Sequence, residues 1–249
     1  MRKITLVLFI VLSILYVKAG IYYVTLNGAG TKDGSSWANA NAGEAGIAAG
    51  ITASASAGGD IWVAAGTYTH STTMTITDKV NIYGGFAGTE SDKGQRTKGT
   101  KAWDYTNATI LSGGTTQVFT LAGNLATGAI IDGFTFTGNT STTQGSIAQT
   151  RGNVTIQNCI FFFFTTSAAN GATVNMLGGT LSYCYIYNNT ATAAVAGGGI
   201  PGGIYANPST GVTTTIDHCL IDKNTGGGLR CQGTAMTYVN ACTFRRNLS

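Results

Sequence analysis

A repeated pattern in the C-terminal half most strongly constrains what this 249-residue chain can fold into. Five segments align when they are started at residues 131, 156, 181, 216 and 239. The first, fourth and sixth positions of each segment are apolar, and together they form three columns: Ile131, Ile156, Leu181, Ile216 and Val239; Phe134, Cys159, Cys184, Cys219 and Cys242; and Phe136, Phe161, Ile186, Ile221 and Phe244. A repeat of about 20–30 residues built from short strands is typical of a solenoid in which each repeat forms one coil.

The repeat predicts an all-β fold, a right-handed parallel β-helix with three strands per coil. Each aligned segment holds two strands, and a third precedes them at residues 119–121, 174–176, 204–206 and 229–231. The composition agrees, because Gly accounts for 36 residues and only 10% of residues are charged, whereas exposed helices are usually rich in Glu, Lys and Arg. A β-sandwich and a propeller are the alternatives, and a propeller blade needs about 40 residues.

Two turns per coil carry residues that tolerate left-handed backbone angles. Gly133 and Asn158 stand at the bend between the first two apolar columns, where strict alternation breaks. A fourth column holds Asn in four of the five segments, at 139, 189, 224 and 247. We expect these Asn residues to occupy the next turn for the same reason, and their stacked side chains to hydrogen-bond from coil to coil.

The N-terminal half continues the same chemistry less regularly. Residues 61–63, 74–76, 80–82 and 109–111 are predicted strands, and residues 87–105 a long charged loop. An Ala-rich stretch at 44–57 has apolar residues at Ala45, Ala48, Ala49 and Ile51, which predicts a short N-terminal capping helix over the open end of the coil stack. We expect a single β-helix domain over residues 20–249.

The first 19 residues read as a secretory signal peptide. Arg2 and Lys3 precede a fourteen-residue apolar run, too short for a comfortable membrane span, and Val17 to Ala19 resembles a cleavage site. The sequence therefore predicts a secreted or cell-surface protein, outer-membrane associated, with no membrane span in the mature chain. The formal net charge of +4 falls to about +1 once the signal leaves. No basic stripe indicates nucleic-acid binding.

Several motifs resemble a known group of proteins. The motifs begin at Tyr23 (YVTLNG), Asp33 (DGSSW), Ile61 (IWVAAGTY) and Ile82 (IYGGF). They resemble the opening of exported right-handed, pectin-lyase-like β-helix proteins of the Bacteroidetes type. The Phe-x-x-Asn units at Phe136 and Phe244 resemble repeats of the polymorphic outer membrane protein family. That resemblance implies the fold, and it leaves activity open among lyases, hydrolases, adhesins and tailspikes. The repeat itself stops at Ser249 without the capping element that a solenoid needs, so we expect the β-helix domain to be truncated at the C-terminus.

The cysteine column has two readings. Export permits disulfides, and neighbouring coils would bring Cys159 near Cys184, or Cys219 near Cys242, within bonding reach. The simpler reading is a ladder of small buried side chains, since the first segment carries Phe134 in the same column. No zinc-type spacing is present, so no metal site is predicted.

Outward positions of the second strand in the aligned segments form an apolar and aromatic strip, the predicted ligand-binding surface. The strip comprises Ile160, Phe162, Tyr185, Tyr187 and Leu220. A soluble protein normally avoids such a patch, and tyrosine rings stack on sugars or anchor protein partners. The predicted partner is a polysaccharide or a host or cell-surface protein, and the alternative is that a loop, another module or a second copy of the chain covers the strip.

The rival function is that of a polysaccharide lyase or glycoside hydrolase of the pectate-lyase-like fold. Such enzymes need an Arg or Lys base, or paired carboxylates, on an outward face. The weak catalytic candidates are Arg230, Asp222 and Asp217. We expect no cofactor, with Ca²⁺ relevant only to a lyase. A row of Thr155, Thr180 and Thr215 is also compatible with ice binding, but only three of the five segments carry Thr there.

Overall fold

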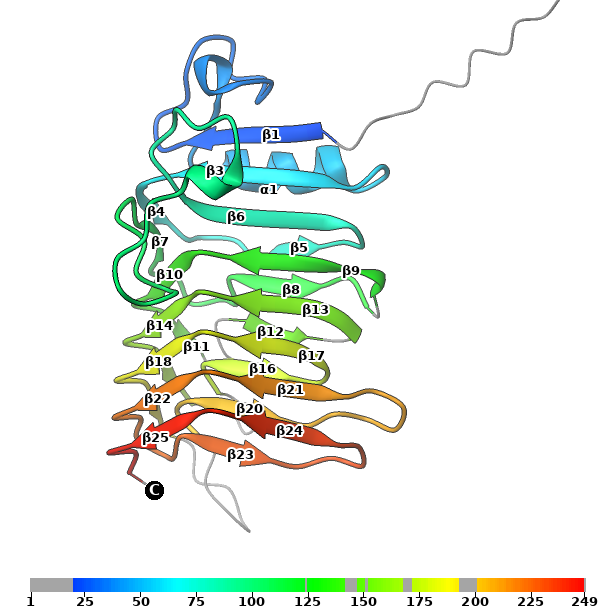
Figure 1. Cartoon of the computed structure of the whole chain (residues 1–249), viewed down its shortest axis with the longest axis vertical. Coiled ribbons are helices and arrows are strands. Elements are labelled where there is room, and N and C mark those ends of the chain that lie inside the picture. The colour runs from blue at the N-terminus through cyan, green and yellow to red at the C-terminus, as the bar shows by residue number, and fades with distance from the viewer. Residues whose placement is uncertain are drawn as a thin grey trace, which may run out of the picture.

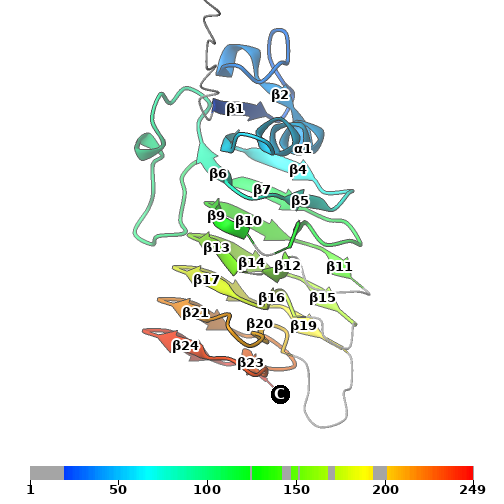
Figure 2. The ribbon, with the colours of Figure 1, turned by 90° about the vertical axis from the view of Figure 1, so that its right-hand side faces the viewer.

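The computed structural model describes residues 20–123, 125–141, 147–150, 152–167, 172–192 and 201–248. The predicted signal peptide at residues 1–19 lies outside the described residues. The described chain is mostly β, with long parallel sheets and one α-helix, and its strands stack along one axis (Figures 1 and 2). This confirms the predicted all-β class and is consistent with a parallel β-helix. No helix within the described ranges is both long enough and apolar enough to span a bilayer.

Three long sheets and one short sheet form the sides of the stack, which we call the wall. Sheet A runs in the order β2 (Asn41–Ala42), β1 (Gly20–Thr25), β3 (Gly59–Ala64), β6 (Val80–Phe86), β9 (Leu125–Asp132), β13 (Gly152–Gln157), β17 (Gly179–Ser182), β21 (Thr214–Asp217), β24 (Thr237–Asn240). Sheet B runs β4 (Gly66–Thr69), β7 (Thr109–Ser112), β10 (Phe134–Thr137), β14 (Ile160–Phe162), β18 (Tyr185–Tyr187), β22 (Leu220–Asp222), β25 (Thr243–Arg245). Sheet C runs β5 (Met74–Ile76), β8 (Phe119–Leu121), β12 (Ile147–Thr150), β16 (Val174–Met176), β20 (Ile204–Ala206), β23 (Leu229–Cys231).

Along the chain, strands of sheets A, B and C follow one another in that order, and the order then recurs. We call one such round a pass. All the strand pairs between successive passes are parallel, as β13 with β17 and β14 with β18 illustrate. The strands predicted at 61–63, 74–76, 80–82 and 109–111 lie in β3, β5, β6 and β7. A short sheet of β11 (Thr140–Ser141), β15 (Thr165–Thr166) and β19 (Thr190–Ala191) follows sheet B and was not predicted.

The three apolar columns form the core except in the last aligned segment, where the prediction was wrong: Val239 is 41% exposed and Phe244 42% exposed. Ile131, Ile156 and Leu181 are paired in register along sheet A and are fully buried. The same holds for the column of Phe136, Phe161 and Ile186 in sheet B, where the Phe136 and Phe161 rings stack at 4.8 Å. Because each side chain contacts its equivalent in the next pass, the repeat in sequence becomes a continuous core.

The cysteine column packs as a ladder of thiols. Cys159, Cys184 and Cys219 are buried, Cys242 is half-buried, and all of them are free. Each Sγ lies within 3.1–3.3 Å of the backbone oxygen two residues earlier. Burial raises the pKa of Cys184 well above its ordinary value, as desolvation of a thiolate requires. These cysteines therefore act as small core residues, in line with the simpler prediction.

The turns partly correct the sequence prediction. At the first bend, Gly133, Asn158 and the residues equivalent to them have positive φ, as predicted: Gly133 (80°), Asn158 (54°), Tyr183 (52°), His218 (50°) and Ala241 (47°). At the second turn the prediction was wrong by one position, because the left-handed conformation is taken by the residue before each member of the fourth column, which is Phe164 in the second segment and Asn in the others: Gly138 (70°), Phe163 (58°), Asn188 (52°), Lys223 (54°) and Arg246 (53°).

The Asn column itself points inward and forms the predicted hydrogen-bonded ladder. Asn189 Nδ2 donates to Asn224 Oδ1 at 2.9 Å, and Asn224 Nδ2 donates to Asn247 Oδ1 at 2.9 Å. Each amide also donates to a backbone oxygen of the preceding pass, for example Asn224 to Ile186 at 3.1 Å. The ladder satisfies backbone groups that a turn buried against the next turn would otherwise leave unpaired.

Helix α1 (Gly43–Ser54) packs near the N-terminal end of the stack (Figure 1), where the sequence predicts a helix. The face of the helix that is buried differs from the predicted one. Its buried residues include Ile47 and Ile51, whereas Ala45 is exposed. Gly50 also lies against the sheet, where a Cβ would come within 2.7 Å of the Tyr22 ring. The glycines that weaken a helix prediction therefore let α1 approach β1 and β3 closely.

Candidate functional site

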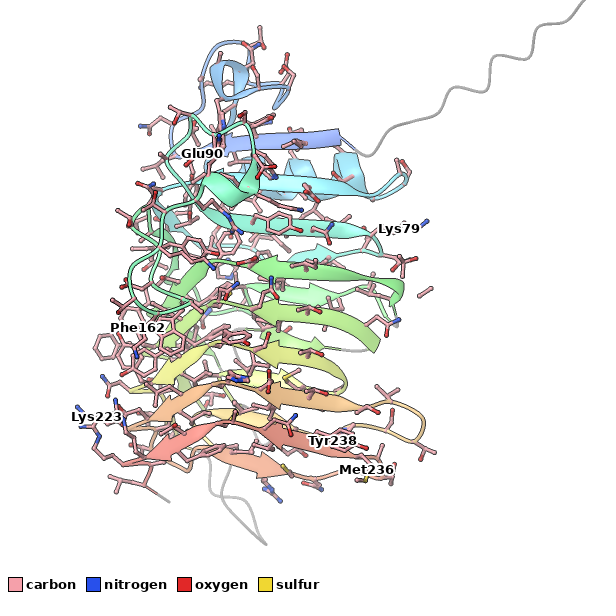
Figure 3. The ribbon with its side chains drawn as sticks, in the orientation of Figure 1. Lys79, Glu90, Phe162, Lys223, Met236 and Tyr238 are labelled. Atoms are coloured by element: carbon pink, nitrogen blue, oxygen red, sulfur yellow. The ribbon has the colours of Figure 1, made fainter. Side chains whose placement is uncertain are left out.

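The predicted strip lies on the outer face of sheet B, as two rows of paired residues. One row joins Ile160, Tyr185 and Leu220, and the second joins Phe162, Tyr187 and Asp222. All members of the strip are half-buried, and Figure 3 shows Phe162 projecting from the wall. Alternation along each strand sends Phe161, Ile186 and Ile221 into the core and these side chains outward.

The aromatic side chains of the strip are stacked on one another. Phe162 and Tyr187, on neighbouring strands, have centroids 5.1 Å apart and an interplanar angle of 7°. Tyr185 and Tyr187, on the same strand, lie 4.2 Å apart at 17°. Burial of Tyr187, together with the neighbouring Tyr185, raises the pKa of its phenol. Because the Tyr187 ring packs against two neighbours, a ligand meets ring edges and hydroxyl groups more than an open ring face.

A loop from the N-terminal half reaches this strip. The loop at residues 87–108 leaves β6 and projects from the side of the stack before it enters β7 (Figure 2). Trp103 in this loop lies with its ring 5.6 Å from Tyr185, tilted by 33°. The strip is therefore partly covered by the loop, so the surface combines segments from both halves of the chain.

A buried carboxylate anchors the loop to the wall. Asp132, at the end of β9, accepts from Tyr105 Oη at 3.0 Å and lies 3.3 Å from Arg96 Nη2. Gln157 and Asn158 of the next pass donate to the same carboxylate at 2.9 and 3.1 Å. Burial raises the pKa of Asp132, but the Arg96 charge and these hydrogen bonds outweigh it, so the pKa lies below its ordinary value.

Arg96 also rests on aromatic rings. Its guanidinium lies 4.9 Å from the Tyr105 ring centroid and 5.3 Å from that of Phe86. Phe86 belongs to a second apolar cluster outside the main core, with Trp62 stacked on it at 4.7 Å and Trp37 at 5.6 Å. The aromatic residues of the N-terminal motifs therefore pack on the outer wall, next to the base of the loop.

Asp222 is held by two arginines, which disfavours a catalytic role. Its side chain is only 1% exposed, with Arg246 Nε at 2.9 Å and Arg245 Nη2 at 3.1 Å. The hydrogen bond from Arg246 and the charges of both arginines keep the pKa of Asp222 below its ordinary value. Tyr185 Oη is 3.5 Å from the same carboxylate. Asp222 thus joins the strip to a cationic border, and its lone pairs are largely occupied.

The other catalytic candidates lie elsewhere. Asp217 ends β21 in sheet A, where its carboxylate pairs with His218 Nδ1 at 2.8 Å, and His218 stacks on Tyr183. Arg230 is in β23 of sheet C, half-buried and engaged with a partner. The three candidates thus belong to three different sheets. Within the described residues, no group of three or more His, Cys, Asp or Glu side chains is arranged to hold a metal ion.

The Thr row is in register but does not extend along the whole sheet. Thr155, Thr180 and Thr215 pair directly across sheet A, with Ile130 at one end and Tyr238 at the other.

Sequence reasoning missed Trp103 and the two arginines beside the strip, Arg245 and Arg246. A signal was present for the arginines, since Arg245 occupies the same repeat column as Asp222. No local pattern indicated that Trp103 would contact Tyr185, because a loop outside the repeat has no column to follow.

Comparison of the chain with protein-family models, curated proteins and solved structures found no match.

Proposed function

We propose that this chain is an exported, non-catalytic surface protein, a right-handed parallel β-helix with three strands per coil. In this proposal the strip of Ile160, Phe162, Tyr185, Tyr187 and Leu220, with Trp103 at its edge, binds a glycan or another cell-surface ligand. The observation that carries the proposal is the stacked row of half-buried aromatic side chains on an outer wall. Such a row is costly to leave in water unless a partner uses it.

The charges around the strip support binding rather than catalysis. Asp222 is neutralised by Arg245 and Arg246, so no free carboxylate faces the aromatic row from that position. The arginines are themselves half-exposed and add hydrogen-bond donors at the border. Phenol hydroxyls, ring edges and guanidinium groups together suit a polar ligand with hydroxyl or acidic groups.

The test is a panel of polysaccharides and intact cell surfaces probed with the full chain and with Tyr185→Ala/Tyr187→Ala. The expected result is attachment to at least one surface that the double variant loses while its thermal unfolding stays cooperative. Tyr238→Ala is the matched control, because Tyr238 is an exposed tyrosine (48%) on sheet A, away from the strip.

The same panel addresses the rival enzyme function. A lyase or hydrolase releases unsaturated or reducing sugar ends, and that release would depend on Arg230 or Asp222. We expect no release of sugar ends by the full chain. Release that Arg230→Ala or Asp222→Ala abolishes would overturn the non-catalytic proposal.

A further inference from the structure

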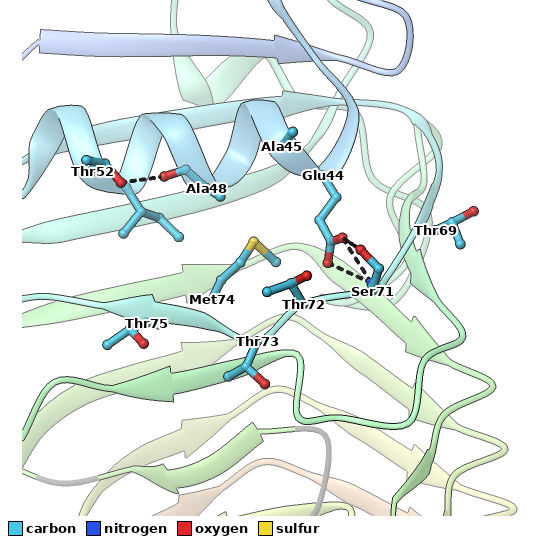
Figure 4. Close-up of a pocket in the computed structure, with 11 residues that line it drawn as sticks. Glu44, Ala45, Ala48, Thr52, Thr69, Ser71, Thr72, Thr73, Met74 and Thr75 are labelled. Atoms are coloured by element: carbon cyan, nitrogen blue, oxygen red, sulfur yellow. Dashed lines mark hydrogen bonds between the residues drawn. The ribbon is translucent and has the colours of Figure 1, made fainter.

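A cavity of about 640 Å³ lies between α1 and the segment that leads into β5 (Figure 4). Ala48 and Thr52 line it from the helix, and Thr73, Met74 and Thr75 line it from the strand side. The helix and the strand segment run alongside each other, with Glu44 at one end of the space and Thr52 at the other. The volume is in the range of ligand-binding pockets, which is about 300–1,000 Å³.

The floor of this cavity is the open edge of a sheet. Among the described strands, sheet C ends at β5, which pairs only with β8. Met74 N–H donates to Val118 O, and Ile76 O accepts from Ala122 N, so these two residues direct their backbone groups toward β8. In a parallel ladder, alternate residues face opposite sides. The N–H and C=O of Thr75 therefore face the cavity.

Helix α1 lies beside this edge, across the cavity from Thr73, Met74 and Thr75. A helix bonds its own backbone groups internally, so it cannot pair with the strand edge beneath it. An unpaired edge strand is a template for another extended chain. The partner that fits the edge is thus an extended peptide, which continues the parallel ladder that runs from β23 to β5.

The cavity also has a single charged side chain in its lining, which is Glu44. Its carboxylate accepts from Ser71 N–H at 2.9 Å and from Ser71 Oγ at 2.7 Å, and it pairs with buried His70. Ser71 precedes β5, so Glu44 lies at the end where a parallel strand would begin. A basic group at the N-terminal end of the peptide complements that carboxylate.

We propose that the space between α1 and β5 binds an extended peptide, which adds to sheet C as a further parallel strand with a basic group beside Glu44. This site is separate from the aromatic strip and does not depend on the proposed surface function.

The probe is the peptide Lys-Val-Thr-Val-Thr-Val-Thr with fluorescein at its C-terminus, titrated with the full chain and followed by fluorescence anisotropy. We expect saturable binding that the Ala48→Phe variant weakens about tenfold or more, because the larger ring fills the cavity. Ala53→Phe is the matched control: Ala53 is an exposed position on the same helix, outside the cavity lining. We expect it to bind the probe as the unaltered chain does.

Further measurements distinguish strand addition from nonspecific binding. Thr75→Pro removes the N–H that faces the cavity and leaves the bonds to β8 in place, so we expect a loss of roughly threefold to tenfold. A probe with proline at its central position lacks a backbone donor. We expect the unaltered chain to bind it more weakly than the parent probe, by at least the factor expected for Thr75→Pro. Replacing its Lys by Glu should weaken binding at low ionic strength.

The proposal is overturned if the probe shows no saturable binding up to about 1 mM, or if the proline-containing probe binds the unaltered chain as well as the parent. Both results are obtained with the unaltered chain, so they do not depend on whether a variant folds. Equal binding by folded Ala48→Phe and Thr75→Pro also overturns it.

Discussion

Trp103, in the loop between β6 and β7, packs its ring 5.6 Å from Tyr185 of β18. Sheet B places β10 and β14 between β7 and β18, so the loop crosses two intervening strands to make this contact. Its base is tied to the wall by Asp132, Arg96 and Tyr105. The N-terminal half of the chain thus supplies one edge of the aromatic surface that the C-terminal repeats build.

Trp103→Ala should loosen the loop without unfolding the wall. An aromatic pair contributes about 0.5–1.5 kcal/mol, so the population of the opened loop should rise roughly twofold to tenfold. Limited trypsin cleavage after Lys101 measures this population. Trp103→Phe keeps a ring on Tyr185 and should be cleaved at nearly the original rate. Equal cleavage of all three proteins would contradict the contact.

Asn224→Ala should cost about 2–4 kcal/mol of unfolding free energy. Asn224 Oδ1 accepts from both the backbone N–H and the side chain of Asn189, which are buried. Removing it leaves these donors without a partner. Asn247→Ala is the matched control at the end of the same ladder, where the side chain is half-buried. Urea unfolding should show the larger loss for Asn224→Ala, and a smaller loss there would contradict the ladder's role.

Asp132 should make stability depend on acid pH. Its pKa is lowered in the folded state, below an unfolded value of about 3.9. The carboxylate therefore contributes its full stabilisation above that value and loses it as the pH falls through the folded pKa. Asp132→Asn leaves Arg96 buried without an anion, so it should cost about 3–5 kcal/mol near neutral pH.

The matching measurement is urea unfolding of the unaltered chain and Asp132→Asn from pH 7 down to pH 2.5. The gap between the two free energies should be constant at neutral pH and narrow below about pH 4. A gap that stays constant to pH 2.5 would show that Asp132 does not act through its charge.

Phe163 occupies a turn position that disfavours its own side chain. Its φ is +58° and the residue is 59% exposed, whereas the equivalent residue of the next pass is Asn188. A left-handed conformation costs most residues about 1–2 kcal/mol, and Asn less. Phe163→Asn should therefore raise the unfolding free energy by about 0.5–1 kcal/mol, offset in part by the lost contact with Phe162. A lower melting temperature for Phe163→Asn would refute this explanation of the turn.

The fold was predictable from the sequence wherever the repeat has columns. The inward positions of Ile156, Phe161 and Cys184 follow from period-2 alternation and from equivalence between repeats, and both are local. The strip was predictable for the same reason, since Tyr185 and Tyr187 alternate with Ile186.

What was not predictable depends on contacts between segments that share no column. The buried face of α1 is set by close approach of Gly50 to Tyr22, which helical periodicity of apolar residues does not register. The contact between the rings of Trp103 and Tyr185 depends on the path of a loop that is held by Asp132. The ion pairs of Asp222 were not foreseen because its charge was considered alone, although Arg245 stands in the same column.

The most direct test of the central claim is the affinity of the strip for its ligand. Affinity electrophoresis in gels containing the polysaccharide that the panel identifies compares the full chain, Tyr185→Ala/Tyr187→Ala and Tyr238→Ala. The account predicts that the double variant binds at least about tenfold more weakly, while Tyr238→Ala migrates as the unaltered chain does. Equal retardation of all three proteins would contradict the claim that the aromatic strip is the binding surface.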